Sequence, residues 1–339
     1  PTPLDKNRNP DLSYVTNCLD LMSPYLKKGQ LLSLESTTYP GTTSEIIAPK
    51  IKDQGLKLGI DFFLVYSPER EDPGNKDYEL KTIPKVCGGY TKNCLKVGAA
   101  LYSSIIDDVV EVSSTECAEM TKLLENIHRS VNIGLVNEMK IISDAMSIDI
   151  NEVISAAATK PFGFVPYRPG PGLGGHCIPV DPFYLSWKAK EQGINAKFIE
   201  LAGEINIQMP EWVVNKIIHS LNKVNKPISK SKILVLGAAY KKNIGDIRES
   251  PSIQIIELLS AMGGEVSYSD PYVKELKKGD SIKRTLKSKH LSSKFLSKLD
   301  CVVIATDHDI FNYQEILQFS NLIIDTRNIL PKHKKVIRA

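Results

Sequence analysis

Residues 169–182 read PGPGLGGHCIPVDP, and this stretch decides how the rest of the chain is interpreted. Four glycines and four prolines in fourteen residues cannot form a helix or a central strand, so a rigid loop is predicted. The loop carries the thiol of Cys177, with Asp181 four residues further on. Glycines let backbone N–H groups approach a ligand closely, which suits an anion held beside a nucleophile. A structural turn around a buried cysteine is the alternative interpretation.

Length and composition are typical of an ordinary globular protein. The 339 residues are enough for two or three domains, and 42% of them are hydrophobic and 24% charged. A net charge of +4 is too small to indicate nucleic acid, and the basic stretch 274–298 is expected to be a solvated loop. No apolar stretch is long enough to cross a bilayer, and no signal peptide is recognisable. Six scattered cysteines without ligand spacing predict no metal site and a reducing, cytoplasmic location.

Strands and helices alternate along the first third of the sequence. Helices are predicted over residues 11–28, 43–54 and 94–105, and strands over 30–35, 62–66 and 108–112. This order is typical of a parallel sheet covered by helices on both faces. Ligands of such sheets lie beyond the carboxyl ends of the strands. Ser36 and Thr37 follow one strand and Glu69 and Arg70 follow another, although caps and turns explain these residues equally well.

From residue 113 the pattern changes to helix alone. Ser113 and Glu116 have the spacing of a capping box, and an apolar stripe then continues for several turns. A long helix with such a stripe suits the core of a dimer. Lys122, Asn126 and Arg129 are spaced i, i+4, i+7 and point the same way, either toward a ligand or toward solvent.

A second α/β pattern occupies the last third of the chain. Helices are predicted over residues 149–160, 210–221 and 252–262, and strands over 232–237, 265–268, 301–305 and 321–325. Pro210 is expected in the first turn of its helix, where no N–H is needed. Loops of this part carry Tyr240, Lys241 and Arg248, and Arg327 follows the last strand. Cationic side chains at strand ends suit a diphosphate.

The chain resembles the UDP-glucose/GDP-mannose dehydrogenase family. The most specific motif is GPGLGGHCIPVDPFYL at residues 170–185, and further motifs follow the order of the family across essentially the whole chain. Members that act on UDP-N-acetylglucosamine are the most similar, with those acting on UDP-N-acetylmannosamine close behind. The resemblance implies an α/β fold with two Rossmann-like parallel-sheet domains, the first incomplete, joined by a central all-helical dimerisation domain with a long helix. The expected domains are 1–112 for NAD, 113–222 for the centre and 223–339 for the UDP-sugar.

The resemblance also implies a reaction, in which NAD is the cofactor and a UDP-sugar the substrate. The C6 alcohol is oxidised by four electrons to the uronic acid, for surface polysaccharide precursors, through a thiohemiacetal and a thioester on Cys177. Lys122 and Asn126 stabilise the alkoxide-like states, and Asp181 orients Lys122 or a water. Glu69, assisted by Thr37, is the candidate base for the hydrolytic water.

Further residues are assigned to binding. The resemblance implies substrate contacts from Gly172, Gly174, Gly175, Tyr240, Lys241 and Arg327, and cofactor contacts from Thr2, Ser36, Thr37 and Arg248. Arg70 and Arg129 are added as substrate-binding candidates from their positions in the sequence. A homodimer or a higher homo-oligomer is expected, without nucleic acid or membrane as a partner.

The identity of the sugar stays open between several candidates. Glucose-specific members of the family use an arginine of the partner subunit a short way before the cysteine. The matching region here, residues 159–163, reads TKPFG and has no arginine, which disfavours UDP-glucose. Both N-acetyl sugars remain, with UDP-N-acetylglucosamine favoured.

Two observations support other classes of function. The GxGxxG fingerprint and the acid that holds the adenosine ribose are not found in this sequence, so we expect them to precede residue 1. The chain alone is then a catalytically silent, nucleotide-sugar-binding dimer. The neighbouring His176 and Cys177 suggest a Cys–His hydrolase, but adjacent side chains on a loop usually diverge.

Overall fold

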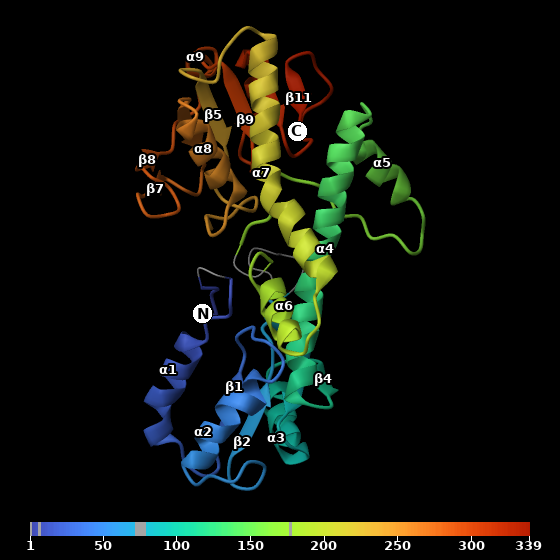
Figure 1. Ribbon diagram of the computed structural model, residues 1–339, viewed down its shortest axis with the longest axis vertical. Coiled ribbons are helices and arrows are strands. Elements are labelled where there is room, and N and C mark those ends of the chain that lie inside the picture. Colours follow the sequence, from blue (N-terminus) through green and yellow to red (C-terminus); the bar gives the residue numbers. More distant parts are fainter. Residues whose placement is uncertain (1, 6–7, 72–78, 176–177) are drawn as a thin grey trace. The chain divides into compact units, whose positions relative to one another are not determined.

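The chain forms two compact units in a computed structural model, which describes residues 2–5, 8–71, 79–175 and 178–339 (Figure 1). The first unit comprises Pro1–Arg129 and Val180–Glu200, and the second comprises Ser130–Pro179 and Leu201–Ala339. Helices α4 (Thr115–Ala145) and α7 (Lys197–Lys223) each contribute to both units. The division into three domains that is expected from the sequence stays a prediction. No helix in the described ranges is both long and apolar enough to cross a membrane.

The first unit contains a four-stranded sheet of order β1-β2-β3-β4. Its strands are β1 (Leu31–Leu34), β2 (Phe63–Tyr66), β3 (Lys85–Gly89) and β4 (Val109–Val112). The pairs β1–β2 and β3–β4 are parallel as predicted, but β2 and β3 are antiparallel. Strand β3 was not predicted because Pro84 and two glycines interrupt its sequence pattern. A Cβ at Gly88 would lie 2.2 Å from the Ser114 carbonyl oxygen, so this strand needs glycine for close packing.

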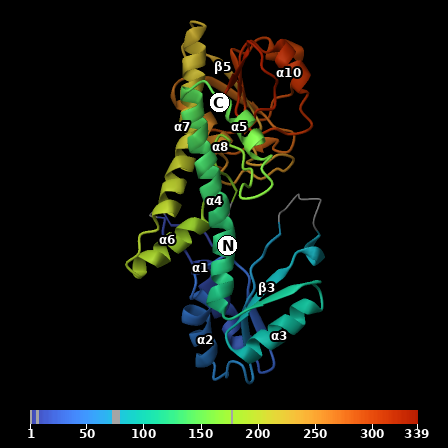
Figure 2. The ribbon, with the colours of Figure 1, turned by 90° about the vertical axis from the view of Figure 1, so that its right-hand side faces the viewer.

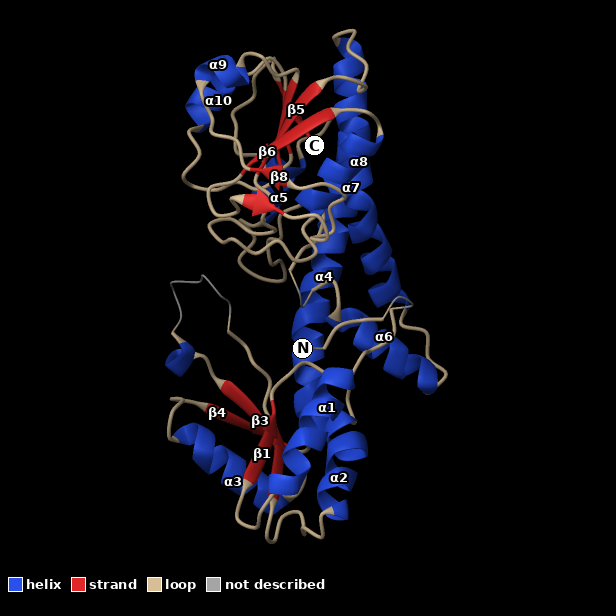
Figure 3. Cartoon of the chain, turned by 90° about the vertical axis from the view of Figure 1, so that its left-hand side faces the viewer, coloured by secondary structure: helices blue, strands red, loops and turns tan. Residues whose placement is uncertain are grey.

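Helices cover both faces of this sheet (Figure 3). Alternate residues of β2 point to opposite faces, so that Val65 packs against α3 (Lys92–Ser103) while Leu64 packs against the other helices. The other elements of this unit are α1 (Ser13–Met22), η1 (Ser23–Tyr25), η2 (Thr42–Ile47), α2 (Ala48–Asp53), η3 (Leu80–Thr82) and α6 (Asp181–Glu191). The helix predicted to reach residue 28 ends at Met22, because Pro24 starts a separate 3₁₀ turn.

The start of α4 corrects one prediction and α5 confirms another. The hydroxyl of Ser114, not that of Ser113, accepts a hydrogen bond from the Cys117 amide at 3.2 Å. Glu116 binds the hydroxyl of Ser44 and does not close a capping box. Helix α5 (Ile150–Ala157) begins as predicted, with the Asp149 carboxylate accepting from the Asn151 amide at 3.1 Å.

The prediction that Pro210 opens a helix is wrong. Pro210 lies inside α7, a helix of 27 residues with nine buried side chains, whose packing outweighs the ~3 kcal/mol cost of an internal proline. Pro210 has no N–H for the carbonyl of Asn206. That carbonyl instead faces Gly172, where a Cβ would lie 3.4 Å from the Asn206 oxygen.

The second unit contains an entirely parallel five-stranded sheet of order β11-β10-β9-β5-β6. The strands are β5 (Lys232–Leu236), β6 (Glu265–Ser269), β9 (Cys301–Ile304), β10 (Ile323–Asp325) and β11 (Val336–Arg338). Helices α7 and α8 (Pro251–Ala261) pack on one face, and α9 (Ser293–Leu296) and α10 (Tyr313–Phe319) on the other (Figure 2). The basic stretch predicted as a loop carries the hairpin β7 (Glu275–Leu276) and β8 (Leu286–Lys287), followed by α9.

Candidate functional site

A buried carboxylate and a buried amide meet in the first unit. Asp181 is the first residue of α6 and Asn126 lies on α4, and Asn126 Nδ2 donates to Asp181 Oδ2 at 2.6 Å. Their exposed fractions are 1% and 5%. Desolvation raises the pKa of Asp181 to about 7, although the amide of Asn126 and the charge of Lys122 oppose this shift. Three of the predicted catalytic residues therefore lie together around a carboxyl group that titrates near neutral pH.

The loop after β1 carries the predicted cofactor contacts. Ser36 is exposed and Thr37 half-buried at the carboxyl end of the strand. Thr38 Oγ1 is buried there and has no hydrogen-bond partner among the described residues. Hydroxyl groups and an orphaned polar atom at a strand end fit the sugar and phosphate groups of a dinucleotide.

A glutamate of α4 holds the continuation of this loop. The carboxylate of Glu119 accepts from the Gly41 amide at 2.7 Å, from the Thr43 amide at 2.9 Å and from the Thr43 hydroxyl at 2.7 Å. Desolvation raises the pKa of Glu119 to about 7, although the three hydrogen-bond donors act to lower it. The same helix thus carries Lys122 and Asn126 and fixes the candidate cofactor loop.

Glu69 and Arg70 follow β2 as predicted, and both are engaged. Glu69 is exposed, and its Oε1 accepts from the Arg70 amide at 2.7 Å while Lys85 Nζ lies 3.3 Å from its Oε2. Desolvation alone would raise the pKa of Glu69, but backbone donors and Lys85 lower it overall. The Arg70 guanidinium binds Glu125 at 2.8 Å and the Pro84 carbonyl at 2.6 Å.

The remaining candidates of the first unit differ in exposure. Thr2 is buried beside α6, where the hydroxyl of Tyr184 donates to the Pro3 carbonyl at 2.9 Å. Arg129 is exposed on α4, seven residues beyond Lys122. The helical spacing predicted for Lys122, Asn126 and Arg129 is confirmed, whereas their roles stay predictions.

The glycine loop packs against the predicted substrate loop of the second unit. A Cβ at Gly174 would lie 2.4 Å from Tyr240 Cβ and 3.2 Å from Pro251 Cδ. Gly175 has a φ of +87° and its amide donates to the Arg248 carbonyl at 2.9 Å, and Gly172 has a φ of +139°. Both positive φ values favour glycine, so the loop conformation explains this part of the sequence.

Two asparagines support the start of the same loop. Asn137 Oδ1 accepts from the Gly170 amide at 3.0 Å, and its Nδ2 donates to Asn206 Oδ1 at 2.9 Å. Arg327 lies beside them, because its guanidinium would be 2.9 Å from a Cβ at Gly170. Arg327 Nε donates to the Ala305 carbonyl at 2.7 Å, so the side chain is held at the end of β10.

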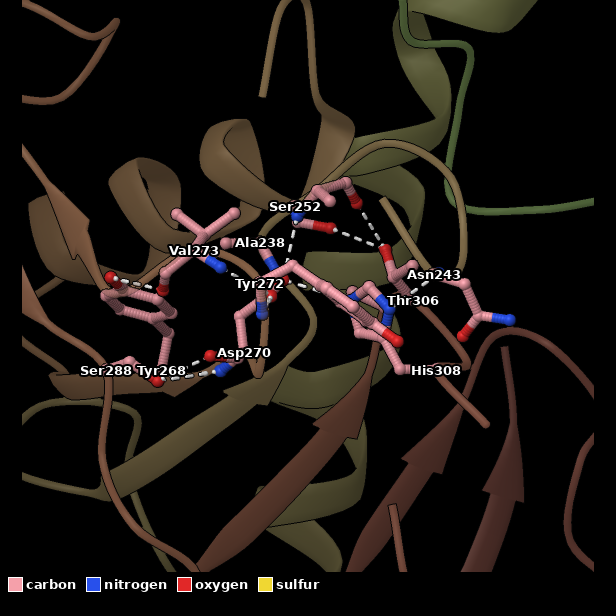
Figure 4. Close-up of polar contacts among 12 residues, drawn as sticks. Ala238, Asn243, Ser252, Tyr268, Asp270, Tyr272, Val273, Ser288, Thr306 and His308 are labelled. Atoms are coloured by element: carbon pink, nitrogen blue, oxygen red, sulfur yellow. Dashed lines mark hydrogen bonds and ion pairs between the residues drawn. The ribbon is translucent and has the colours of Figure 1, made fainter. Parts of the chain in front are cut away.

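A buried acid and a buried histidine connect the loop that carries Tyr240 and Lys241 to the ends of neighbouring strands (Figure 4). Asp270 Oδ2 accepts from the Ala238 amide at 2.7 Å and from His308 Nε2 at 3.0 Å. His308 Nδ1 accepts from the Asn243 amide at 2.9 Å, which leaves the proton of the neutral ring on Nε2. This network ties the ends of β5, β6 and β9 together and fixes both ends of the loop between Ala238 and Asn243.

Arg248 has a carboxylate partner on its own loop. Its Nε lies 3.0 Å from Asp246 Oδ1 and its Nη2 lies 2.6 Å from Asp246 Oδ2. Ser250 stands at the start of α8 without capping it by its side chain, and donates its hydroxyl to the Ala238 carbonyl at 2.7 Å. The loop between β5 and α8 is therefore closed by polar contacts of its own.

An alanine at Gly174 is expected to destabilise the second unit and weaken UDP binding. The new Cβ collides with Tyr240 and must displace that loop or the glycine loop, at a cost of about 1–3 kcal/mol. Thermal denaturation and calorimetric titration with UDP measure both effects. The control Gly163→Ala meets open space at a φ of +70°, so it should cost about 1–2 kcal/mol without changing UDP affinity. A Gly174→Ala variant that binds UDP as tightly as the wild type would show that packing of the glycine loop against Tyr240 does not support UDP binding.

Sequence patterns did not identify five residues that support the site, namely Lys85, Glu119, Asn137, Asp270 and His308. Asp270 and His308 each follow a predicted strand, and this position is the signal by which the sequence could identify them. His176 and Cys177 lie outside the described residues.

Comparison with known proteins assigns the chain to a family of dehydrogenases. Residues 1–106, 116–208 and 234–332 match the NAD binding domain, the central domain and the UDP binding domain of the UDP-glucose/GDP-mannose dehydrogenase family. The chain belongs to this family. It is therefore an oxidoreductase, NAD is its cofactor, and the resemblance drawn from its motifs is confirmed.

Individual relatives act on two N-acetylhexosamines. The chain is 37% identical over 275 residues to the UDP-N-acetyl-D-glucosamine 6-dehydrogenase of Pseudomonas aeruginosa, covering 80% of this chain and 65% of that one. It is 36% identical over 342 residues to the UDP-N-acetyl-D-mannosamine dehydrogenase of Methanococcus vannielii, covering 97% of this chain and 74% of that one. A solved UDP-D-ManNAc dehydrogenase of Pyrococcus horikoshii superposes with a TM-score of 0.88 at 32% identity, and the match covers 99% of this chain and 78% of that one. The predicted fold class is confirmed.

Proposed function

We propose that this protein oxidises the C6 alcohol of a UDP-N-acetylhexosamine, with UDP-N-acetylglucosamine favoured, to the uronic acid. The Asn126–Asp181 pair beside Lys122 carries the proposal, because it combines a donor, a cation and a carboxyl group that titrates near pH 7. NAD, when bound, accepts the hydride of each of the two oxidation steps. The relatives support an N-acetylhexosamine as the substrate.

Cys177 is proposed as the nucleophile. Its thiolate adds to the C6 aldehyde, and the resulting thiohemiacetal is oxidised to a thioester, which water cleaves to the acid and the free thiol. Lys122 stabilises the negative oxygen at each tetrahedral stage, and Asn126 donates a further hydrogen bond. The family motif around Cys177 supports this assignment.

Asp181 is better suited than Glu69 to activate the hydrolytic water. A general base works best when its pKa lies near the pH at which the enzyme operates. The pKa of Asp181 is raised to about 7, whereas the pKa of Glu69 is lowered below its ordinary value. We therefore propose Asp181 as the base, and Glu69 with its partner Lys85 as a fixed ion pair near the candidate cofactor loop.

A homodimer is proposed as the working form. Exposed apolar side chains lie along the part of α4 that belongs to the second unit, namely Leu135, Met139 and Ile142, and the exposed Met146 follows directly after the helix. A second copy would remove such a stripe from water. The predicted cytoplasmic location stays a prediction.

UDP-N-acetylmannosamine and UDP-glucose are the alternative substrates, and a panel of the three UDP-sugars distinguishes them. We expect UDP-N-acetylglucosamine to give the highest kcat/KM. The alternative class, a silent nucleotide-sugar-binding dimer, predicts UDP binding without turnover of any of the three.

Two NADH are expected for each UDP-sugar consumed, because alcohol and aldehyde are oxidised in succession at one site. Absorbance at the NADH band and mass spectrometry of the sugar nucleotide measure the ratio. One NADH for each sugar, with a free aldehyde as the product, would contradict the proposed route through Cys177. No NADH with any of the three sugars would support the silent dimer.

A further inference from the structure

A buried histidine of the second unit, His308, contacts the loop that carries Tyr240 and Lys241 (Figure 4). The exposed fraction of His308 is 0%, and that of its partner Asp270 is 3%. Both ring nitrogens are engaged, one with Asp270 and the other with Asn243. A side chain that is buried and bonded on both sides cannot touch a substrate, so its role in the reaction acts through the residues that it holds.

Asp270 fixes the tautomer of this ring. Its Oδ2 accepts from His308 Nε2 at 3.0 Å and from the amides of Ala238 and Ala239 at 2.7 Å and 3.1 Å. Its Oδ1 accepts from the Val273 amide at 2.9 Å. Burial alone would raise the pKa of Asp270, but His308 and the backbone donors lower it overall, so the ionised carboxylate only accepts. The Nε2 of His308 therefore carries the proton, which leaves Nδ1 as an acceptor.

The Nδ1 of the ring holds the far end of the substrate loop. It accepts from the Asn243 amide at 2.9 Å, and Asn243 itself has a φ of +64°. The side chain of Asn243 donates from Nδ2 to Asp309 Oδ2 at 2.6 Å. The near end is held at Ala239 by the carboxylate that also binds the ring. The backbone on both sides of Tyr240 and Lys241 is thus fixed by side chains of other segments.

The position of this loop also determines where the glycine loop can lie. A Cβ at Gly175 would lie 3.0 Å from the ring of Tyr240, and a Cβ at Gly174 would lie 2.4 Å from Tyr240 Cβ. Both glycines therefore pack directly against Tyr240, and Cys177 follows two residues later in the sequence. Because protein interiors are closely packed, a shift of Tyr240 must move the glycine loop or leave a gap beside it.

We propose that His308 is a positioning residue for the UDP-sugar. By joining Asp270 to Asn243 it sets the loop that presents Tyr240 and Lys241, and through Tyr240 it sets the glycine loop. The inference rests on the proposed function, because it takes these two loops as the binding site of the sugar nucleotide. It predicts that the affinity for UDP depends on the acceptor at Nδ1, and not only on the stability that the buried network contributes.

Two amide variants separate the two hydrogen bonds of the ring. His308→Gln places an amide nitrogen near the position of Nε2, so it keeps the donor to Asp270 and loses the acceptor for Asn243. His308→Asn places an amide oxygen near the position of Nδ1, so it keeps that acceptor and loses the donor. Each variant loses the volume of the ring and one buried hydrogen bond, so thermal denaturation should show similar losses of stability for both.

The affinity for UDP should distinguish the two variants. Calorimetric titration is expected to show UDP binding weakened about tenfold or more in His308→Gln, and by less than about threefold in His308→Asn. A loss of stability alone would weaken UDP binding equally in both variants. The control His219→Gln replaces an exposed histidine of the same unit and should bind UDP as the wild type does.

A measurement on the wild type tests the inference even where His308→Gln fails to fold. Nitrogen NMR of the protein with labelled histidine should show His308 as the Nε2–H tautomer. UDP should shift the Nδ1 resonance, because the ligand binds the loop whose amide donates to this nitrogen. The signal is assigned by its loss in His308→Asn.

Lys241→Met tests the proposed substrate contact separately. Weaker UDP binding in Lys241→Met, with unchanged binding in His308→Gln, overturns the positioning role alone. Unchanged binding in both variants also overturns the assignment of this loop to the sugar nucleotide. UDP binding that is weakened in His308→Asn as much as in His308→Gln, or an Nδ1 resonance that UDP does not shift, shows that the network is only structural and overturns the inference.

Discussion

Replacing Cys177 with alanine is expected to abolish formation of the uronic acid, lowering its rate by about 10³-fold or more. An aldehyde cannot lose a second hydride until a nucleophile has made it tetrahedral, and alanine removes that nucleophile. Binding of UDP and the UDP-sugar should change little, because the proposed substrate contacts come from other residues. Mass spectrometry of the sugar nucleotide measures the acid, and NADH absorbance measures the residual first oxidation.

Cys18→Ala provides the matched control, because Cys18 is an exposed thiol in the first unit. It should leave turnover unchanged. Iodoacetamide should label Cys177 faster than the exposed Cys18 and Cys117, because the proposed nucleophile must react as a thiolate. A Cys177→Ala enzyme that forms the uronic acid at the normal rate would show that the oxidation needs no thioester.

Local patterns in the sequence predicted most elements of the fold. Alternating strands and helices located every strand of the two sheets except β3 and β11, and the spacing on α4 placed Lys122 and Asn126 on one helix. These features depend on neighbouring residues, which a sequence displays directly. The glycine loop was predicted for the same reason, since Gly172 and Gly175 have positive φ values that few other residues adopt.

Contacts between distant segments could not be predicted in this way. The bond between Asn126 and Asp181 joins residues 55 positions apart, and the support of Gly41 by Glu119 joins residues 78 positions apart. Whether such a carboxyl group titrates near pH 4 or near pH 7 depends on the burial that these contacts create. Pro210 illustrates the same limit, because packing of both halves of α7 decided that the helix continues through it.

Asp181→Asn is expected to lower kcat by about 10²–10³-fold and to remove the limb of the pH–rate profile near pH 7. The pKa of Asp181 is raised to about 7 by burial, so the wild-type carboxylate forms as the pH rises through 7 and then accepts a proton from water. Asparagine fits the same space beside Asn126 but cannot act as a base. Steady-state kinetics between pH 5.5 and pH 9 measure both effects, with Asp53→Asn as an exposed control in the same unit.

The same variant makes a prediction about stability. In the folded protein Asp181 keeps its proton up to about pH 7, whereas in the unfolded chain the carboxyl group ionises near its ordinary value of 3.8. The folded state therefore binds the additional proton between these two values, and the free energy of unfolding falls as the pH rises from about 4 to about 7. Asp181→Asn cannot titrate, so it should match the wild type near pH 4 and exceed it above pH 7, by on the order of a few kcal/mol. A variant that is slower but has the wild-type pH dependence of both stability and kcat would show that Asp181 is ionised throughout. In that case it orients Asn126 and Lys122, and another group activates the water.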